Sequence, residues 1–257
     1  MTGHTLNDSG PEPVVPGRSI LTTLEHPVPP PTGRYRWVYL WHWPIRMMHW
    51  VAALSLLALI WTGFTIGRPY FLPAVAPSGP FYIGWMRLIH FIAAGALVAT
   101  AVVRMYWLIA GNRYERFSAL FPVKRSDWVN MYRQVKFYLM IHPERAPHYL
   151  GHNPLQQLSY TLTYLVAFLM VVTGFTMYGQ ANPCGFIHEA TAWIAPLLGG
   201  MPTVRLLHHV LTWYFLIFVP IHVYLTIRSD LLERSGTVSS IVSGGRFVPT
   251  DRHFIDG

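Results

Sequence analysis

Two histidines, fourteen residues apart in one apolar stretch, are the side chains best placed to do chemistry. His208 and His222 lie in a run of apolar residues long enough to form a membrane-spanning helix. At about 100° per residue, fourteen steps return to within about 40° of the starting direction, and at about 1.5 Å per residue they rise about 21 Å. The two imidazoles are therefore expected on one face of the helix, near opposite sides of a bilayer.

Two further histidines stand near the starts of two other apolar runs. With His49 and His90, the chain has four intramembrane histidines that can form two stacked pairs. Facing histidine pairs between helices are the axial ligands that two bis-histidine hemes require. Zinc is a poor alternative, because depth in the membrane separates the histidines into pairs and no Cys or carboxylate completes a tetrahedral site.

The helices that would position these histidines follow from the composition. The chain is 52% hydrophobic and 12% charged, which is typical of an integral membrane protein. Apolar runs long enough to cross a hydrocarbon core of about 30 Å occur near residues 47–66, 88–110, 155–178 and 206–227. Because these runs lack the strict alternation of barrel strands, we predict an all-α integral membrane protein, a four-transmembrane-helix bundle binding two hemes b.

Basic residues predict the orientation. Of the 19 Lys and Arg side chains, fifteen lie before the first span, in the loop at 111–154 or after the last span. Cytoplasmic segments carry the excess of basic residues, so we expect a multi-pass protein of the cell inner membrane with both termini and this loop in the cytoplasm. This asymmetry explains the net charge of +8, and no nucleic-acid-binding motif accompanies it. The expected surroundings are membrane lipid and not nucleic acid.

Depth along the helices pairs the histidines. With the N-terminus inside, the first helix runs outward, and the second and fourth run inward. This places His49 level with His222 near the cytoplasmic side, and His90 level with His208 near the outer side. The adjacent His209 is thirteen residues from His222, which leaves an angular mismatch of about 140°. His208 is therefore the expected iron ligand.

Two other residues repeat the fourteen-residue interval. Gly63 follows His49 at this interval, so the first helix presents no side chain toward the outer cofactor and a flat macrocycle can approach its backbone. Arg104 follows His90 at the same interval and is expected near the inner cofactor. There its guanidinium either pairs with heme propionates or snorkels to the cytoplasmic edge, and the spacing leaves both interpretations open.

The rest of the chain is predicted as tails and loops. Residues 1–40 are proline-rich and are expected to form a disordered cytoplasmic tail, residues 41–232 the diheme cytochrome domain, and residues 233–257 a second cytoplasmic tail. Cys184 is the only cysteine, so neither an internal disulfide nor an iron–sulfur site is expected. Seven histidines in loops or at span edges are expected to be exposed or interfacial: His26, His42, His142, His148, His152, His188 and His253.

Four segments of the chain carry a family resemblance. They are MMHWVAALSLLALIWTGFTIG, RLIHFIAAGALVATAVVRMYWLIAGNRYERF, HNPLQQLSYTLTYLVAFLMVVTGFTMYG and HHVLTWYFLIFVPIHVYLTIRSDL. Together they resemble the b-type cytochrome subunit of membrane-bound uptake Ni/Fe-hydrogenases, over nearly everything from about residue 40 to 232. The resemblance implies a membrane anchor that takes electrons from the small subunit of a periplasmic hydrogenase and delivers them through two hemes b to quinone. The hydrogen chemistry would then belong to the small and large partner subunits.

The resemblance also implies residue roles. In this family and in the related gamma subunits of formate dehydrogenases, helices one and four hold the cytoplasmic-side heme, and helices two and four hold the other. These helices carry the same two histidine pairs that depth in the membrane predicts. In the formate dehydrogenase relatives, an Asn at the start of the third helix contacts the quinone; Asn153 stands at the corresponding place here, and Gln156 follows on the same face. Asn153 could instead cap the helix ahead of Pro154.

Other functions fit part of this pattern. The chain could be the cytochrome b subunit of another periplasmic oxidoreductase, such as a formate dehydrogenase. It could also be a heme-free transporter whose histidines relay protons, or a purely structural anchor for a partner enzyme. A reduced-minus-oxidised spectrum separates these classes, because only a cytochrome shows b-type bands.

Overall fold

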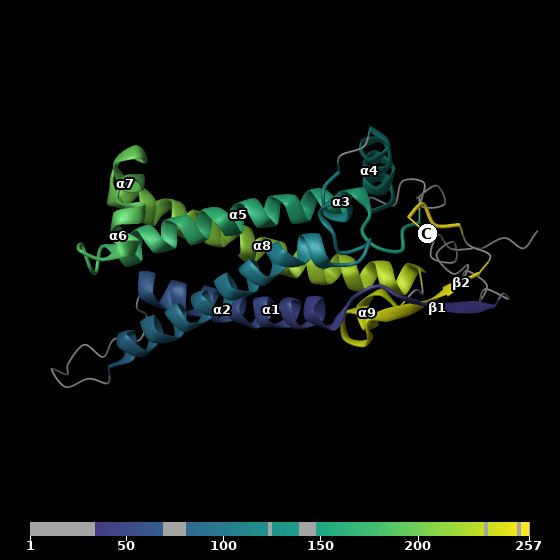
Figure 1. The fold of residues 1–257 in the computed structure, drawn as a ribbon, viewed down its shortest axis with the longest axis horizontal. Coiled ribbons are helices and arrows are strands. Elements are labelled where there is room, and N and C mark those ends of the chain that lie inside the picture. The colour runs from purple at the N-terminus through teal and green to yellow at the C-terminus, as the bar shows by residue number, and fades with distance from the viewer. Residues whose placement is uncertain are drawn as a thin grey trace, which may run out of the picture.

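Four long helices run side by side and form the body of the protein (Figure 1). The computed structural model describes residues 34–68, 81–122, 125–138, 148–233, 236–250 and 253–256. The long helices are α1 (Trp43–Gly67), α2 (Tyr82–Ala110), α5 (Pro154–Gly179) and α8 (Met201–Glu233). The four-helix membrane fold expected from the sequence is confirmed.

The helices pair into two hairpins. Along the chain, α1 packs on α2 and α5 packs on α8. Aromatic side chains join the hairpins: Phe64 of α1 lies edge-on to Trp213 of α8 with ring centroids 5.5 Å apart, and Phe91 of α2 lies edge-on to Tyr178 of α5 at 5.1 Å. Aromatic rings favour such edge-to-face contacts. The bundle therefore consists of two tight hairpins that face each other.

The helices extend beyond the predicted spans at most ends. α2 begins at Tyr82 rather than at 88, and α8 covers Met201–Glu233 rather than 206–227. Hydropathy marks only the part of a helix that crosses the hydrocarbon core, whereas helical hydrogen bonding continues into the interfacial layer. α8 also continues through Pro220, which has no N–H to donate to the preceding turn and therefore favours a bend between His208 and His222.

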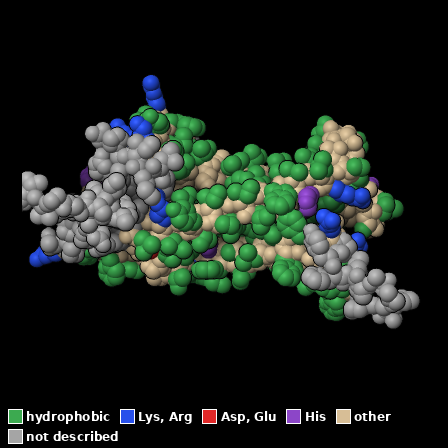
Figure 2. Space-filling view, turned by 180° about the vertical axis from the view of Figure 1, so that it is seen from behind, with side chains coloured by type: hydrophobic (Ala, Val, Ile, Leu, Met, Phe, Trp, Pro, Cys, Tyr) green, Lys and Arg blue, Asp and Glu red, His purple; other side chains and the backbone are tan. Residues whose placement is uncertain are grey.

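The outer surface of the bundle is apolar. Large side chains such as Leu54, Ile92 and Phe168 are each at least 64% exposed. Hydrophobic side chains cover the middle of the molecule, and Lys and Arg lie toward its ends (Figure 2). In water this surface would be unstable, whereas lipid solvates it. The chain is a multi-pass membrane protein.

The two ends of the bundle carry different elements (Figure 1). One end, called the sheet end below, holds β1 (Tyr35–Tyr39), α3 (Phe117–Leu120), α4 (Arg125–Tyr138), α9 (Thr237–Ser243) and β2 (Gly245–Pro249). The opposite end, called the far end, holds α6 (Phe186–Thr191) and α7 (Ile194–Leu197). The segments before the first span and after the last span therefore share one end with the long middle loop.

The two-stranded sheet is a correction to the sequence-based prediction. Residues 35–39 and 245–249 were expected in tails, but β1 and β2 pair antiparallel, with Trp37 opposite Phe247 and their ring centroids 4.8 Å apart. Aromatic cross-strand pairs stabilise such ladders, but a partner about two hundred residues away is not visible in a local pattern. Leu40 and Val248 lie with Tyr114 and Leu150 in a buried cluster at this end. Residues 1–33 of the predicted tail lie outside the described residues.

Candidate heme-binding sites

The structure brings the four intramembrane histidines together in two pairs. His49 on α1 and His222 on α8 lie close enough for their imidazoles to interact electrostatically, and they form the sheet-end pair. His90 on α2 and His208 on α8 interact in the same way and form the far-end pair. These are the partners expected from depth and helical phase. Their binding of heme stays a prediction.

Each imidazole of the far-end pair is held by a threonine from the neighbouring helix of its hairpin. Thr62 Oγ1 on α1 lies 2.8 Å from His90 Nδ1, and Thr173 Oγ1 on α5 lies 2.8 Å from His208 Nδ1. A glycine follows each threonine. Consequently the two hairpins hold their far-end histidines in the same way.

The glycines face the same two rings. A Cβ placed on Gly63 would lie 3.5 Å from His90 Cε1, and one placed on Gly174 would lie 3.4 Å from His208 Cε1. Gly63 therefore stands at the level of the far-end pair, as expected, and the imidazole fills part of the space beside it. The approach of a macrocycle to its backbone remains a prediction.

The sheet-end pair has different surroundings. His222 stacks on Phe218 with ring centroids 5.5 Å apart, and Phe218 stacks on Tyr214 at 5.6 Å, so an aromatic column follows one face of α8. His49 lies edge-on to Trp50 at 5.3 Å. Within the described part of the chain, neither imidazole of this pair has a hydrogen-bond partner.

The adjacent His208 and His209 point to different helices. His208 contacts Thr173 of α5, whereas the His209 ring lies edge-on to Phe64 of α1 at 5.5 Å. This agrees with the helical phase that selects His208. Among the described residues no three His, Cys, Asp or Glu side chains gather as a metal site. The arrangement therefore offers paired axial ligands, which suit a heme, and does not offer a tetrahedral ligand set.

Arg104 is held in place at the sheet end of α2. Its Nε donates to the Tyr164 hydroxyl at 3.2 Å, and its Nη2 donates to the Glu115 backbone carbonyl at 3.1 Å. Its Nη1 is buried and has no hydrogen-bond partner among the described residues. A buried guanidinium N–H without a partner is the feature that an anionic propionate would satisfy. This observation favours the first of the two interpretations that the sequence left open.

Asn153 and Gln156 form a capping box at the start of α5. Asn153 Oδ1 accepts from the Gln156 N–H at 2.9 Å, and Gln156 Oε1 accepts from the Asn153 N–H at 3.0 Å. Capping by Asn153 ahead of Pro154, the alternative left open by the sequence, is confirmed. Both side-chain oxygens are thus occupied, while their amide NH₂ groups have no partner in the described region.

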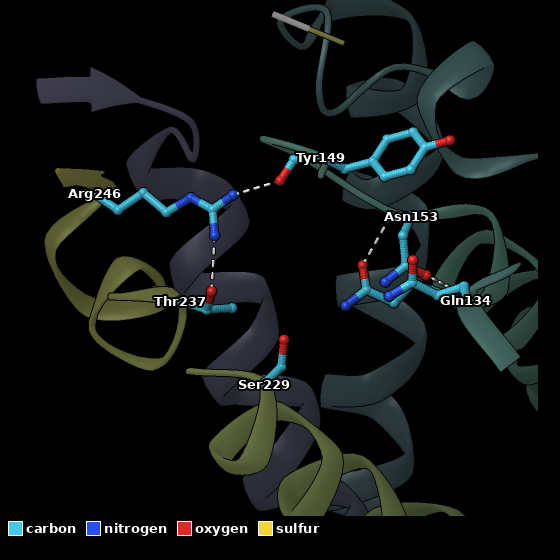
Figure 3. A pocket seen from close by; sticks show the side chains of 8 residues that line it. Gln134, Tyr149, Asn153, Ser229, Thr237 and Arg246 are labelled. Carbon is cyan, nitrogen blue, oxygen red and sulfur yellow. Dashed lines mark hydrogen bonds between the residues drawn. The ribbon is translucent and has the colours of Figure 1, made fainter. Parts of the chain in front are cut away.

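The two amides line a small polar pocket at the sheet end (Figure 3). Its other lining residues come from α4, the segment before α5, α8, α9 and β2: Gln134, Tyr149, Gly151, Ser229, Thr237 and Arg246. Arg246 donates to the Thr237 hydroxyl at 2.8 Å and to the Tyr149 carbonyl at 2.6 Å, which closes one side. Free amide N–H groups in a partly buried pocket can donate to a carbonyl oxygen.

His152 lies just ahead of α5 at the sheet end, where it is partly buried. The sequence predicts an exposed or interfacial side chain; the structure adds that its ring packs between Trp41 and Tyr160, with ring centroids 4.9 Å from each. Burial, together with the positive charge of Arg104, lowers the pKa of His152 to about 3. The ring is therefore neutral at physiological pH. Trp41 and His152 are far apart in the sequence, so no local pattern predicts this packing.

Glu115 organises the sheet end. Its carboxylate is fully buried and accepts hydrogen bonds from the His42 backbone N–H at 2.6 Å, the Trp107 indole at 2.9 Å and the Asn112 backbone N–H at 3.1 Å. It also bonds the His42 ring at 2.8 Å. Burial acts to raise the pKa of Glu115, but the hydrogen bonds from His42, Trp107 and Asn112 outweigh it and hold the pKa below its ordinary value. The carboxylate ties the start of α1 to the end of α2.

Replacing this carboxylate should destabilise the protein. In Glu115→Gln, an NH₂ group takes the place of one oxygen and faces N–H donors, so we expect a loss of about 1 to 3 kcal/mol and a lower thermal midpoint in detergent. Because the folded pKa is depressed, the stabilisation is present above the ordinary carboxyl pKa of about 4.3 and is lost as the pH falls through the folded value. The difference between wild type and variant should therefore shrink in acid. Glu189→Gln, at an exposed site, is the matched control and should change little; equal effects of the two substitutions would contradict this role.

A four-helix membrane bundle with two pairs of neighbouring histidines, one toward each end, has the architecture of a membrane cytochrome b. Comparison with known proteins shows the family. Residues 40–244 match the family model described as prokaryotic cytochrome b561, and the chain belongs to this family. The resemblance found in the sequence is confirmed, and membership in a b-type cytochrome family implies heme b.

The relatives carry one name. The chain is 37% identical over 214 residues to the probable Ni/Fe-hydrogenase B-type cytochrome subunit of Cupriavidus necator, covering 81% of this chain and 86% of the relative. It is 36% identical over 220 residues to the protein of the same name from Azotobacter vinelandii, covering 84% and 90%. The probable Ni/Fe-hydrogenase 1 B-type cytochrome subunit of Escherichia coli is 31% identical over 217 residues, with 81% and 90% covered.

Sequence reasoning missed the two threonines and Glu115. A signal for the threonines exists, because the tetrapeptide Thr-Gly-Phe-Thr occurs at 62–65 and again at 173–176. The repeat marks equivalent turns of α1 and α5, each of which faces the histidine of the next long helix. Glu115 gives no comparable signal, since its partner His42 lies 73 residues earlier in the chain.

Proposed function

We propose that this chain is the membrane subunit of a Ni/Fe-hydrogenase, and that it carries electrons from the hydrogenase small subunit at the periplasmic face to quinone near the cytoplasmic face. The observation that carries the proposal is the presence of two pairs of neighbouring histidines at two depths of one membrane bundle. Heme b bound at each pair supplies reversible one-electron exchange. The names of the relatives support a hydrogenase as the partner.

The residues divide between two hemes b. His49 and His222 would ligate the iron of the cytoplasmic-side heme, and His90 and His208 the iron of the periplasmic-side heme. Arg104, whose buried Nη1 has no hydrogen-bond partner in the described part of the chain, would pair with a propionate of the cytoplasmic-side heme. Gly63 would leave room beside the periplasmic-side heme.

The sheet end is proposed to face the cytoplasm in the cell inner membrane. Fifteen of the 19 basic residues belong to segments before the first span, in the long middle loop or after the last span. The described parts of these segments gather at the sheet end (Figure 1). Because basic residues favour the cytoplasmic side, both termini would lie inside. The far end, with α6 and α7, would then meet the hydrogenase subunits, where the hydrogen chemistry takes place.

The quinone is proposed to bind at the polar pocket of the sheet end. The NH₂ groups of the Asn153 and Gln156 amides have no hydrogen-bond partner among the residues described there, while their oxygens hold the capping box. An amide N–H donated to a quinone carbonyl would hold the acceptor near the sheet-end pair. One residue pair would thus both cap α5 and bind the quinone.

Hydrogen-driven spectroscopy tests the function. In membranes that contain the chain with its hydrogenase, hydrogen should reduce b-type bands, and a quinone should reoxidise them. Membranes that lack the hydrogenase should show the same bands only after a chemical reductant. Bands that respond to formate and not to hydrogen would assign the chain to a different oxidoreductase, and a colourless protein would overturn the cytochrome proposal in favour of a transporter or structural anchor.

A further inference from the structure

Two buried threonine hydroxyls contact the two imidazoles of the far-end pair. Thr62 is 2% exposed and Thr173 is 3% exposed, and each Oγ1 lies 2.8 Å from a histidine Nδ1. The two threonines lie on different hairpins, and each is the first residue of a Thr-Gly-Phe-Thr tetrapeptide. The arrangement therefore occurs twice, once for each histidine of the pair.

The direction of these hydrogen bonds follows from the other contacts of the hydroxyls. Thr62 donates its single proton to the Ala58 carbonyl at 2.7 Å, and Thr173 donates to the Leu169 carbonyl at 2.8 Å. Each oxygen can then only accept from the imidazole, so Nδ1 of each ring must carry the hydrogen. In a neutral imidazole, this leaves the lone pair on Nε2, the nitrogen free to bind iron.

The sheet-end pair has no such contact. Among the described residues, neither His49 nor His222 has a hydrogen-bonded side chain, and His222 is held by stacking on Phe218 instead. The two pairs therefore differ in how their rings are oriented. Within the segments that the structure describes, a neighbouring hydroxyl sets both the tautomer and the ring direction for the far-end rings and not for the sheet-end rings.

We propose that Thr62 and Thr173 are positioning residues of the far-end heme, which fix the tautomer and ring plane of both axial imidazoles and raise their basicity. The proposal rests on the proposed function, since it requires heme at His90 and His208. Outer partners of metal-bound histidines orient the ring, and their loss typically costs about 10- to 100-fold in metal affinity. A more basic imidazole stabilises ferric iron, so the hydroxyls should hold the midpoint potential of this heme down.

Isosteric replacement tests the role. Thr62→Val and Thr173→Val remove each hydroxyl and keep the side-chain shape. We expect the far-end heme to titrate at a higher midpoint potential, its ferric electron paramagnetic resonance signal to move, and its retention on purification to weaken about tenfold. The sheet-end heme should keep its midpoint potential and its electron paramagnetic resonance signal. An unchanged sheet-end heme shows that the variant has folded. Thr62→Ser and Thr173→Ser restore a hydroxyl and should return the far-end heme toward wild-type behaviour.

Thr176→Val is the matched control. Thr176 is equally buried and donates to the Val172 carbonyl at 2.8 Å, and among the described residues it makes no hydrogen bond to a histidine. It should leave both hemes unchanged. The proposal is overturned if the valine variants keep a wild-type far-end potential and signal, if serine fails to restore them, or if Thr176→Val causes the same shift. A wild-type chain without a far-end heme overturns the proposed function as well, and this is measured before any variant.

Discussion

Replacing any one of the four paired histidines with alanine is expected to remove one heme and leave the other. His49→Ala or His222→Ala should remove the sheet-end heme, and His90→Ala or His208→Ala the far-end heme, because each iron needs both imidazoles of its pair. The heme-to-protein ratio should fall from about two to about one. Hydrogen-dependent quinone reduction should fall to background in all four variants.

His209→Ala is the matched control for this series. His209 is adjacent to His208 but faces Phe64 of α1, so its loss should leave both hemes in place. The pairing would be wrong if His209→Ala removed a heme while His208→Ala left both. It would also be wrong if His49→Ala and His90→Ala removed the same heme, since they belong to different pairs.

The second large effect is expected at the quinone pocket. Asn153→Ala with Gln156→Ala removes the amide donors, and a hydrogen bond of about 1 to 2 kcal/mol lost in a low-dielectric site slows quinone reduction by roughly tenfold or more. Both heme bands should remain, and so should reduction of an artificial acceptor by the attached hydrogenase. Turnover with hydrogen and quinone is the measurement.

The capping box requires a second variant, because alanine also removes the cap of α5. Asn153→Ser with Gln156→Glu keeps a serine–glutamate capping box but carries no amide N–H. It should slow quinone reduction as much as the alanine pair while keeping the wild-type thermal midpoint. Normal quinone turnover in this variant would show that the residues act only as a cap. Loss of the sheet-end heme would show that they are structural.

The histidine pairs could be predicted because a helix is regular. Rise and angle per residue are nearly constant, so the spacing of His208 and His222 along the chain determines both their depth and their face. Pro220 lies between them and favours a bend, yet the imidazoles of both pairs still interact. In a regular helix, residue spacing in the sequence therefore predicts the depth and the face of each side chain.

Features that depend on distant segments could not be predicted. β1 and β2 pair across more than two hundred residues, and the Glu115 carboxylate is bound by His42, which lies 73 residues earlier in the chain. Asn153 shows a different limit, because the same residue type suits a helix cap and a quinone donor, and the sequence could not separate these roles. The threonines were accessible in principle through the Thr-Gly-Phe-Thr repeat, but only the structure shows that it faces histidines.

Two histidine pairs in one bundle are proposed to hold two hemes b. The most direct measurement is the heme-to-protein ratio of the purified wild-type chain, taken together with its reduced-minus-oxidised spectrum. We expect about two hemes b per chain, with the low-spin spectrum of bis-histidine ligation. A chain that binds a single heme, or none, when purified under mild conditions with its hydrogenase would contradict this proposal.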